Sequence, residues 1–142
     1  MDPRSRTLFL VLIVAQAAHS VEEYVFRLYD VLAPARAIGE AFGFGDRPVG
    51  FAVFNAVLLA FALWCWLARV RPGHRHARVF AWFWALLEAG NGVGHVVFAI
   101  EAGGYFPGLA TTCVLLPASV ALLWMLLSRR TADSLRRSDR TG

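Results

Sequence analysis

The sequence lacks lysine, has only two cysteines and contains none of the short motifs that mark several common enzyme classes. A Gly-x-Ser-x-Gly nucleophile elbow, a phosphate-binding loop and a Cys-x-x-Cys pair are all absent, which argues against the chemistry that those motifs support. Cys65 and Cys113 lie in different apolar segments. We expect both to remain free thiols that pack as small hydrophobic side chains.

Charge is scarce over long stretches of the chain. Hydrophobic residues make up 58% of its 142 residues, and the mean hydropathy is +0.53. A membrane-spanning helix needs about 20 predominantly apolar residues, and four segments approach that length: residues 7–23, 48–70, 79–102 and 105–127. We therefore predict an all-α, polytopic membrane protein in which residues 1–128 form a single domain, a bundle of four transmembrane helices.

The basic residues, all fourteen of them arginine, predict the topology. They are concentrated before the first segment, between the second and third, and after the fourth. The excess of positive charge on cytoplasmic loops then places both termini in the cytoplasm. Because the arginines flank apolar segments and form no stripe interleaved with base-stacking aromatics, the pI of about 9.8 indicates the lipid bilayer as the partner and argues against nucleic acid.

Three regions fall outside this simple pattern. Residues 24–47 mix apolar and charged side chains, which favours an interfacial amphipathic helix followed by a glycine-rich turn. Residues 129–142 form a short, basic and serine-rich segment, and we expect a disordered cytoplasmic tail.

The first segment also resembles a cleaved signal peptide, with Arg4 and Arg6 before an apolar core and Ala15-Gln16-Ala17 as a cleavage site. Cleavage would remove the first span.

Ionisable side chains interrupt the first apolar segment. Because residues three and four apart share a helix face, one side of this helix carries Gln16, His19, Glu22 and Glu23. Charged groups inside a membrane are costly and are functional candidates by default. Ser20 follows His19 but lies about 100° away around the helix, which argues against a serine nucleophile activated by that histidine.

The third segment carries a second polar row and a pair of glycines. Glu88, Asn91 and His95 fall on one helix face. Gly90 and Gly94 form a Gly-x-x-x-Gly pair, a pattern typical of close helix packing in membranes.

Depth along the helices predicts that the two rows meet. A rise of about 1.5 Å per residue places His19 roughly 18 Å from the cytoplasmic start of its helix, and His95 roughly 24 Å from the start of its own. Further polar residues at similar depth are Asn55, Thr111 and Thr112. We predict one polar layer in the outer half of the bundle. The protein itself could act alone or as a homo-oligomer.

Histidine and carboxylate rows on two facing helices are a ligand set for divalent metals such as zinc or iron. The candidate ligands are His19, Glu22, Glu88 and His95. The spacing differs from the Glu-x-x-His pattern of di-metal bundles. The same groups therefore also suit metal-free acid–base chemistry, with Glu22 or Glu23 as base and His19 or His95 as acid.

Three functions follow from this polar layer. The favoured one is an intramembrane enzyme, either a hydrolase or isomerase or a metalloenzyme, that acts on a lipid-soluble substrate. A proton or ion pathway is the second. A structural or interaction protein, in which the polar layer fixes the helix register, is the third. The supporting residues of a site would be Gln16, Asn55, Asn91, Tyr105 and Thr112.

The motif His19-Ser20-Val21-Glu22-Glu23, followed by His95 and by Tyr105-Phe106-Pro107-Gly108, resembles the HXXEE family of small membrane proteins. The resemblance implies a transmembrane enzyme of unknown activity. It marks His19, Glu22, Glu23, His95, Tyr105, Pro107 and Gly108 as the residues to examine. Residues 105–108 would form the turn that enters the fourth span, with Pro107 suited to the first helical turn. Tyr105 would gate the site or serve as an interfacial anchor.

Overall fold

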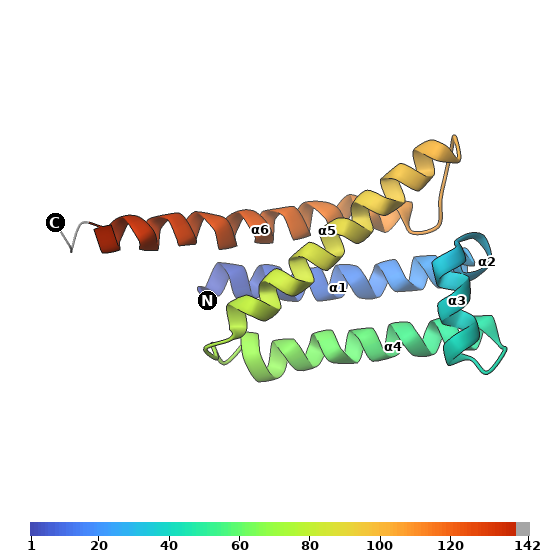
Figure 1. Ribbon diagram of the computed structural model, residues 1–142, viewed down its shortest axis with the longest axis horizontal. Coiled ribbons are helices and arrows are strands. Elements are labelled where there is room, and N and C mark those ends of the chain that lie inside the picture. The colour runs from blue at the N-terminus through green and yellow to red at the C-terminus, as the bar shows by residue number, and fades with distance from the viewer. Residues whose placement is uncertain (139–142) are drawn as a thin grey trace.

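The protein folds into helices joined by short turns, with no strand in residues 1–138 (Figure 1). This computed structural model describes the backbone of residues 1–138 and the side chains of residues 1–128. Its elements are α1 (Pro3–Val25), α2 (Leu28–Val31), α3 (Ala33–Phe42), α4 (Arg47–Cys65), the π-helix η1 (Trp66–Val70), α5 (Ala77–Glu101) and α6 (Leu109–Ser138).

Four helices are long and apolar enough to cross a membrane: Pro3–Val25, Arg47–Val70, Ala77–Glu101 and Leu109–Ser128. They confirm the predicted all-α bundle, and the chain is compatible with an integral membrane protein. The predicted disordered tail began at residue 129, but α6 continues as a helix to Ser138. The rest of that tail, residues 139–142, lies outside the described residues.

Two of these helices begin with the same kind of N-terminal cap. Asp2 and Asp46 cap α1 and α4, because each side chain accepts a hydrogen bond from the backbone N–H three residues later. Pro3 and Pro48 lie in the first turns, where the missing N–H of proline costs nothing. The fourth span differs, because Pro107 precedes α6 by two residues and lies in the turn before it.

α1 lies at the centre of the bundle, between α6 and α4, and α5 runs obliquely across α6 (Figure 1). The main hydrophobic core lies among these helices and includes Phe9, Leu12, Trp84 and Leu115, each 2% exposed or less. By contrast, α4 and α5 contact each other little, and they diverge toward the end of the bundle that carries α2 and α3 (Figure 1).

The segment between the first two spans forms two helices, α2 and α3, and a turn, where the sequence predicted one helix and a glycine-rich turn. α3 packs on the start of α4 so closely that their backbones touch. A Cβ atom on Gly50 would collide with the Gly39 carbonyl oxygen and the Gly43 nitrogen. A second hydrophobic cluster, which includes Tyr29, Phe51 and Phe106, fills the space beneath α2 and α3.

The predicted close packing at Gly90 and Gly94 is wrong. A Cβ atom at Gly90 would meet nothing within 4 Å, and one at Gly94 would reach only Phe98 at 3.9 Å. Gly92 is the close-packed glycine, because a Cβ atom there would lie 2.9 Å from Leu116 Cβ on α6. The face of α5 that packs on α6 is therefore rotated from the face that the motif indicates.

Substitution of Gly50 by alanine tests the contact between α3 and α4. The added methyl group must push the two backbones apart, and we expect a loss of about 1–3 kcal/mol in stability. Thermal unfolding in detergent measures it, with Gly104→Ala as the control because a Cβ atom at Gly104 meets nothing within 4 Å. Equal melting temperatures for the two variants would contradict the close contact.

Candidate functional site

Most of the predicted polar residues lie inside the bundle. Those that are 9% exposed or less are Gln16, His19, Glu22, Glu23, Asn55, Glu88, His95 and Thr112. Asn91 is half-buried, and Tyr105 is 50% exposed. These side chains do not form one uniform layer. They form three groups, centred on the carboxylates of Glu23, Glu22 and Glu88.

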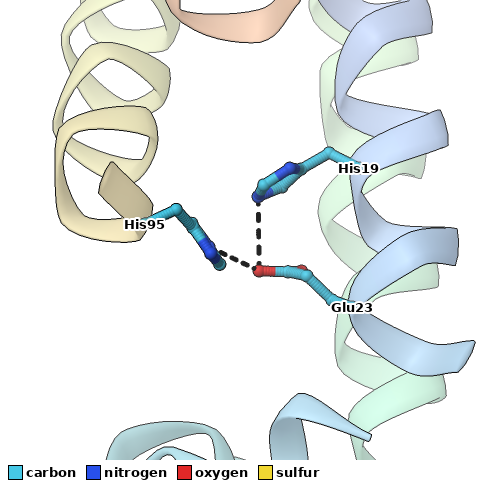
Figure 2. Close-up of side chains that lie close together, drawn as sticks. All are labelled: His19, Glu23 and His95. Carbon is cyan, nitrogen blue, oxygen red and sulfur yellow. Dashed lines mark hydrogen bonds and ion pairs between the residues drawn. The ribbon is translucent and has the colours of Figure 1, made fainter. Parts of the chain in front are cut away.

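The first group, which we name the His/Glu cluster, consists of His19, Glu23 and His95 (Figure 2). Glu23 Oε1 lies 3.0 Å from His95 Nε2 and 3.4 Å from His19 Nε2. One ligand atom from each residue lies within 4.8 Å of the other two. α1 supplies two of these residues one turn apart, and α5 supplies the third. The two imidazole rings meet edge to face at 4.5 Å between centroids.

The second group joins α1 to the start of α6 through Glu22. One carboxylate oxygen accepts hydrogen bonds from the Tyr105 hydroxyl at 2.5 Å and the Ala110 N–H at 3.0 Å. The other accepts from the Thr111 N–H at 2.7 Å and from the Thr111 hydroxyl at 2.5 Å. The first N–H groups of a helix have no partner inside it and favour a negative charge. Glu22 thus caps α6 from a different helix.

The contacts of Thr111 fix the proton on His19. Thr111 Oγ1 has one hydrogen, which it donates to Glu22. Its contact with His19 Nδ1 at 2.8 Å must then be a hydrogen bond that the ring N–H donates. The other nitrogen, Nε2, lies 3.4 Å from Glu23 Oε1, on the inner side of the His/Glu cluster. It carries a lone pair in a neutral imidazole and a proton in an imidazolium.

Two ring nitrogens of the His/Glu cluster are buried without a hydrogen bond among the described residues: His19 Nε2 and His95 Nδ1. Most buried polar atoms in proteins have a partner. His19 is fully buried, and its Nε2 lies 3.4 Å from the Glu23 carboxylate, the distance of an ion pair when the ring is protonated (Figure 2). His95 Nδ1 is the ring nitrogen of the cluster that has neither a hydrogen bond nor an ion pair among the described residues.

Gly108 makes room for both imidazoles. It has a positive φ of 93°, which residues other than glycine rarely adopt. A Cβ atom there would lie 2.7 Å from His95 Nδ1 and 2.8 Å from His19 Cε1. The turn at residues 105–108 was predicted, and the structure shows why its last residue is glycine.

The third group surrounds Glu88. In the orientation of its amide that turns the NH₂ group toward Glu88, Gln16 donates to a Glu88 oxygen at 2.6 Å. Ser20 Oγ, which has one hydrogen, lies 3.2 Å from the Gln16 oxygen and 2.8 Å from Asn55 Oδ1, the shorter of the two contacts. Asn91 lies at 3.5 Å from the Glu88 carboxylate, the limit of a hydrogen bond. This chain of polar groups links α1, α4 and α5.

The structure therefore changes the predicted grouping. Of the four predicted metal ligands, His19 and His95 meet, but Glu22 contacts the start of α6 and Glu88 contacts Gln16, away from the two histidines. Glu23 takes the place between the histidines. Thr112 donates only to the Gly108 carbonyl oxygen, within its own helical turn.

Two residues that were not predicted as members of the site join these groups, although the depth of Thr111 had placed it in the polar layer. Ser20 contacts both Gln16 and Asn55, and Thr111 bridges Glu22 and His19. The position of Thr111, three residues after the Tyr-x-Pro-Gly motif, was the available signal for its role.

The fold and the buried polar groups define an α-helical protein with spans suited to a membrane and a His/Glu cluster between two of them. Residues 10–122 match the model of a family described as a protein of unknown function with an HXXEE motif. The chain belongs to this family, as the motifs indicate. No curated protein and no solved structure matches the chain.

The contact between Tyr105 and Glu22 is testable by pH titration. Partial burial and the hydrogen bond to the Glu22 carboxylate raise the pKa of Tyr105 from its usual 10 to about 12. The neutral phenol is the favoured form in the fold. The stabilisation from this contact is therefore complete below pH 10 and is lost as the pH rises through about 12.

The difference in ultraviolet absorbance between the wild type and Tyr105→Phe isolates this phenol from Tyr24 and Tyr29. We expect its ionisation step near pH 12, and a step closer to the usual pKa in Glu22→Gln. An ordinary pKa for Tyr105 in the wild type would contradict the contact.

Proposed function

We propose that the protein is an intramembrane enzyme whose His/Glu cluster binds one divalent metal ion and acts on a lipid-soluble substrate. The observation that carries this proposal is the His/Glu cluster itself, three buried residues from two helices whose ligand atoms lie within 4.8 Å of one another. Neutral imidazole nitrogens and carboxylate oxygens are ligands that divalent metals such as zinc take.

The spacing of the donor atoms supports the proposal. With metal–ligand bonds of about 2.0–2.1 Å, the ligand atoms of a tetrahedral zinc site lie about 3.3 Å apart. Glu23 Oε1 lies 3.0 and 3.4 Å from the two Nε2 atoms. Two histidines and one glutamate form one of the ligand sets of catalytic zinc, in which the fourth position stays open for water or substrate.

The surroundings of His19 add a second line of support. Histidines that bind metals usually donate their other ring N–H to an acceptor, which fixes the ring and its tautomer. His19 donates to Thr111, which donates in turn to the Glu22 carboxylate. A bound divalent ion would supply Lewis-acid polarisation of a substrate oxygen, or a reactive hydroxide at neutral pH. Hydrolysis and isomerisation of a lipid are both compatible with such a site.

The orientation in the membrane remains part of the proposal. α1 begins at the end of the bundle where α6 ends (Figure 1). The loop between α4 and α5, which carries Arg71 and Arg75, lies at the same end of the bundle. The positive-inside rule supports a cytoplasmic location for that end, which places the His/Glu cluster toward the opposite face.

Metal content is the direct test of the proposed cluster. We expect about one zinc or iron ion per chain in protein purified in detergent, and its loss in the double variant His19→Ala/His95→Ala, since two of three ligands are removed. Elemental analysis measures the ion. The matched control is His74→Ala/His76→Ala, because these two histidines lie exposed in the loop between α4 and α5.

Glu23→Gln and Glu22→Gln separate the two adjacent carboxylates. We expect Glu23→Gln to lose the metal, and Glu22→Gln to keep a weakened site because Glu22 acts through Thr111. A folded wild type without stoichiometric metal would sink the metalloenzyme proposal and favour acid–base catalysis or a proton path.

The contact of Thr111 with His19 predicts a graded effect. Loss of such an outer partner typically lowers metal affinity about 10–100-fold, and we expect this range for Thr111→Val. Competition with a chromogenic chelator measures the affinity. Thr112→Val is the control, because the hydroxyl of Thr112 contacts only the Gly108 carbonyl. Equal affinities in the two variants would remove Thr111 from the site.

A further inference from the structure

An open cavity of about 560 Å³ lies beside the His/Glu cluster and is lined by residues of α1, α2–α3, α4 and α5. This volume is in the range of about 300–1,000 Å³ that small-molecule pockets occupy. Glu23 belongs both to the cavity wall and to the His/Glu cluster. A molecule in the cavity therefore lies next to the proposed metal ligands.

The wall of the cavity is divided by chemistry. Leucine, isoleucine and phenylalanine side chains from α2, α3 and α4 form an apolar wall, which includes Leu32, Ile38 and Phe54. The polar groups come from the facing helices and from α4, and they are Gln16, Glu23, Asn55, Glu88 and Asn91. Such a wall suits an amphiphile with one polar end.

The charge of the polar side of the cavity determines which head group the cavity can bind. Two carboxylates, those of Glu23 and Glu88, line the cavity, and no arginine does so among the described residues. Glu88 is 1% exposed, and the two side chains that contact its carboxylate, those of Gln16 and Asn91, are neutral amides. A buried carboxylate is costly unless a cation or several hydrogen bonds compensate for it. An ammonium group would supply that cation, whereas an anionic head group would be repelled.

We infer that the cavity opens to the side of the bundle between α4 and α5, two helices that both line it. These helices contact each other little, and Leu86 and Leu87 on the cavity wall are 56% and 39% exposed. Gly90 also lines the cavity, and a Cβ atom there would meet nothing within 4 Å. A chain in the surrounding lipid can therefore enter without passing through water.

We propose that this cavity binds a long-chain amine, with its ammonium group against Glu88 and its hydrocarbon chain along the apolar wall under α3. As an assignment of the substrate, this inference rests on the proposed function of the adjacent cluster. As an assignment of a binding site, it rests on the cavity and its carboxylates alone. The two can be tested separately.

Native mass spectrometry of the full chain in detergent, with dodecylamine, dodecanol and dodecanoate in equal amounts, tests the head group. The three probes share one chain length and differ in charge. We expect one bound dodecylamine per protein and weaker binding of the other two. Equal binding of dodecanol or dodecanoate would overturn the recognition of an ammonium group.

Two pairs of variants locate the binding. Glu88→Gln should weaken dodecylamine binding about tenfold or more, because it removes a charge-assisted contact, whereas Glu101→Gln, on the exposed end of the same helix, should not. Gly90→Phe should block the cavity, whereas Gly94→Phe, outside the cavity wall, should not. Unchanged binding in both Glu88→Gln and Gly90→Phe would place the amine elsewhere and overturn the proposal.

Metal content distinguishes this proposal from the proposed function. Gly90→Phe should lose dodecylamine and keep the metal, since no cluster residue is changed. The His19→Ala/His95→Ala variant should lose the metal and keep the Glu88 contact. Circular dichroism and gel filtration of each variant confirm folding. A Gly90→Phe protein that is folded and metal-bound, yet binds dodecylamine like the wild type, would overturn the cavity assignment while leaving the metal site intact.

Discussion

The contact between the Glu22 carboxylate and the start of α6 is the interaction on which the rest of the site depends. Four hydrogen bonds from Tyr105, Ala110 and Thr111 converge on this one side chain. They compensate for the burial of a charge and satisfy two N–H groups that a helix start leaves without partners. Through Thr111 the same contact orients His19. One carboxylate thus joins α1 to α6 and sets the direction of a ring nitrogen.

The adjacent glutamates show how helix geometry divides two like side chains between two tasks. Consecutive residues are separated by about 100° around a helix, so Glu22 faces α6 while Glu23 faces His95 on α5. Neither can take the other's place without a rotation of α1. The paired glutamates of the motif are therefore two different parts of one arrangement, a helix cap and a member of the His/Glu cluster.

The fold was largely predictable because long apolar segments leave few alternatives to membrane-spanning helices. The polar rows on α1 and α5 were predictable from helical periodicity, and His19 and His95 do meet. Periodicity could not choose between Glu22 and Glu23, which both lie on the polar side of α1. That choice depends on the rotation of each helix, which packing decides. The glycines illustrate the same limit: the Gly-x-x-x-Gly pattern indicated Gly90 and Gly94, yet Gly92 meets Leu116.

α4 and α5 contact each other little, although both contribute to the main hydrophobic core with α1 and α6. The His/Glu cluster belongs to α1 and α5, and the cap at Glu22 belongs to α1, the start of α6 and the turn before it. By contrast, α3 and α4, joined through their glycines, form most of the apolar wall of the cavity. The residues of the cluster thus come from other helices than most of the apolar wall. If the proposed function holds, substitutions in α3 and α4 would alter the length or shape of the chain that fits without replacing a residue of the cluster.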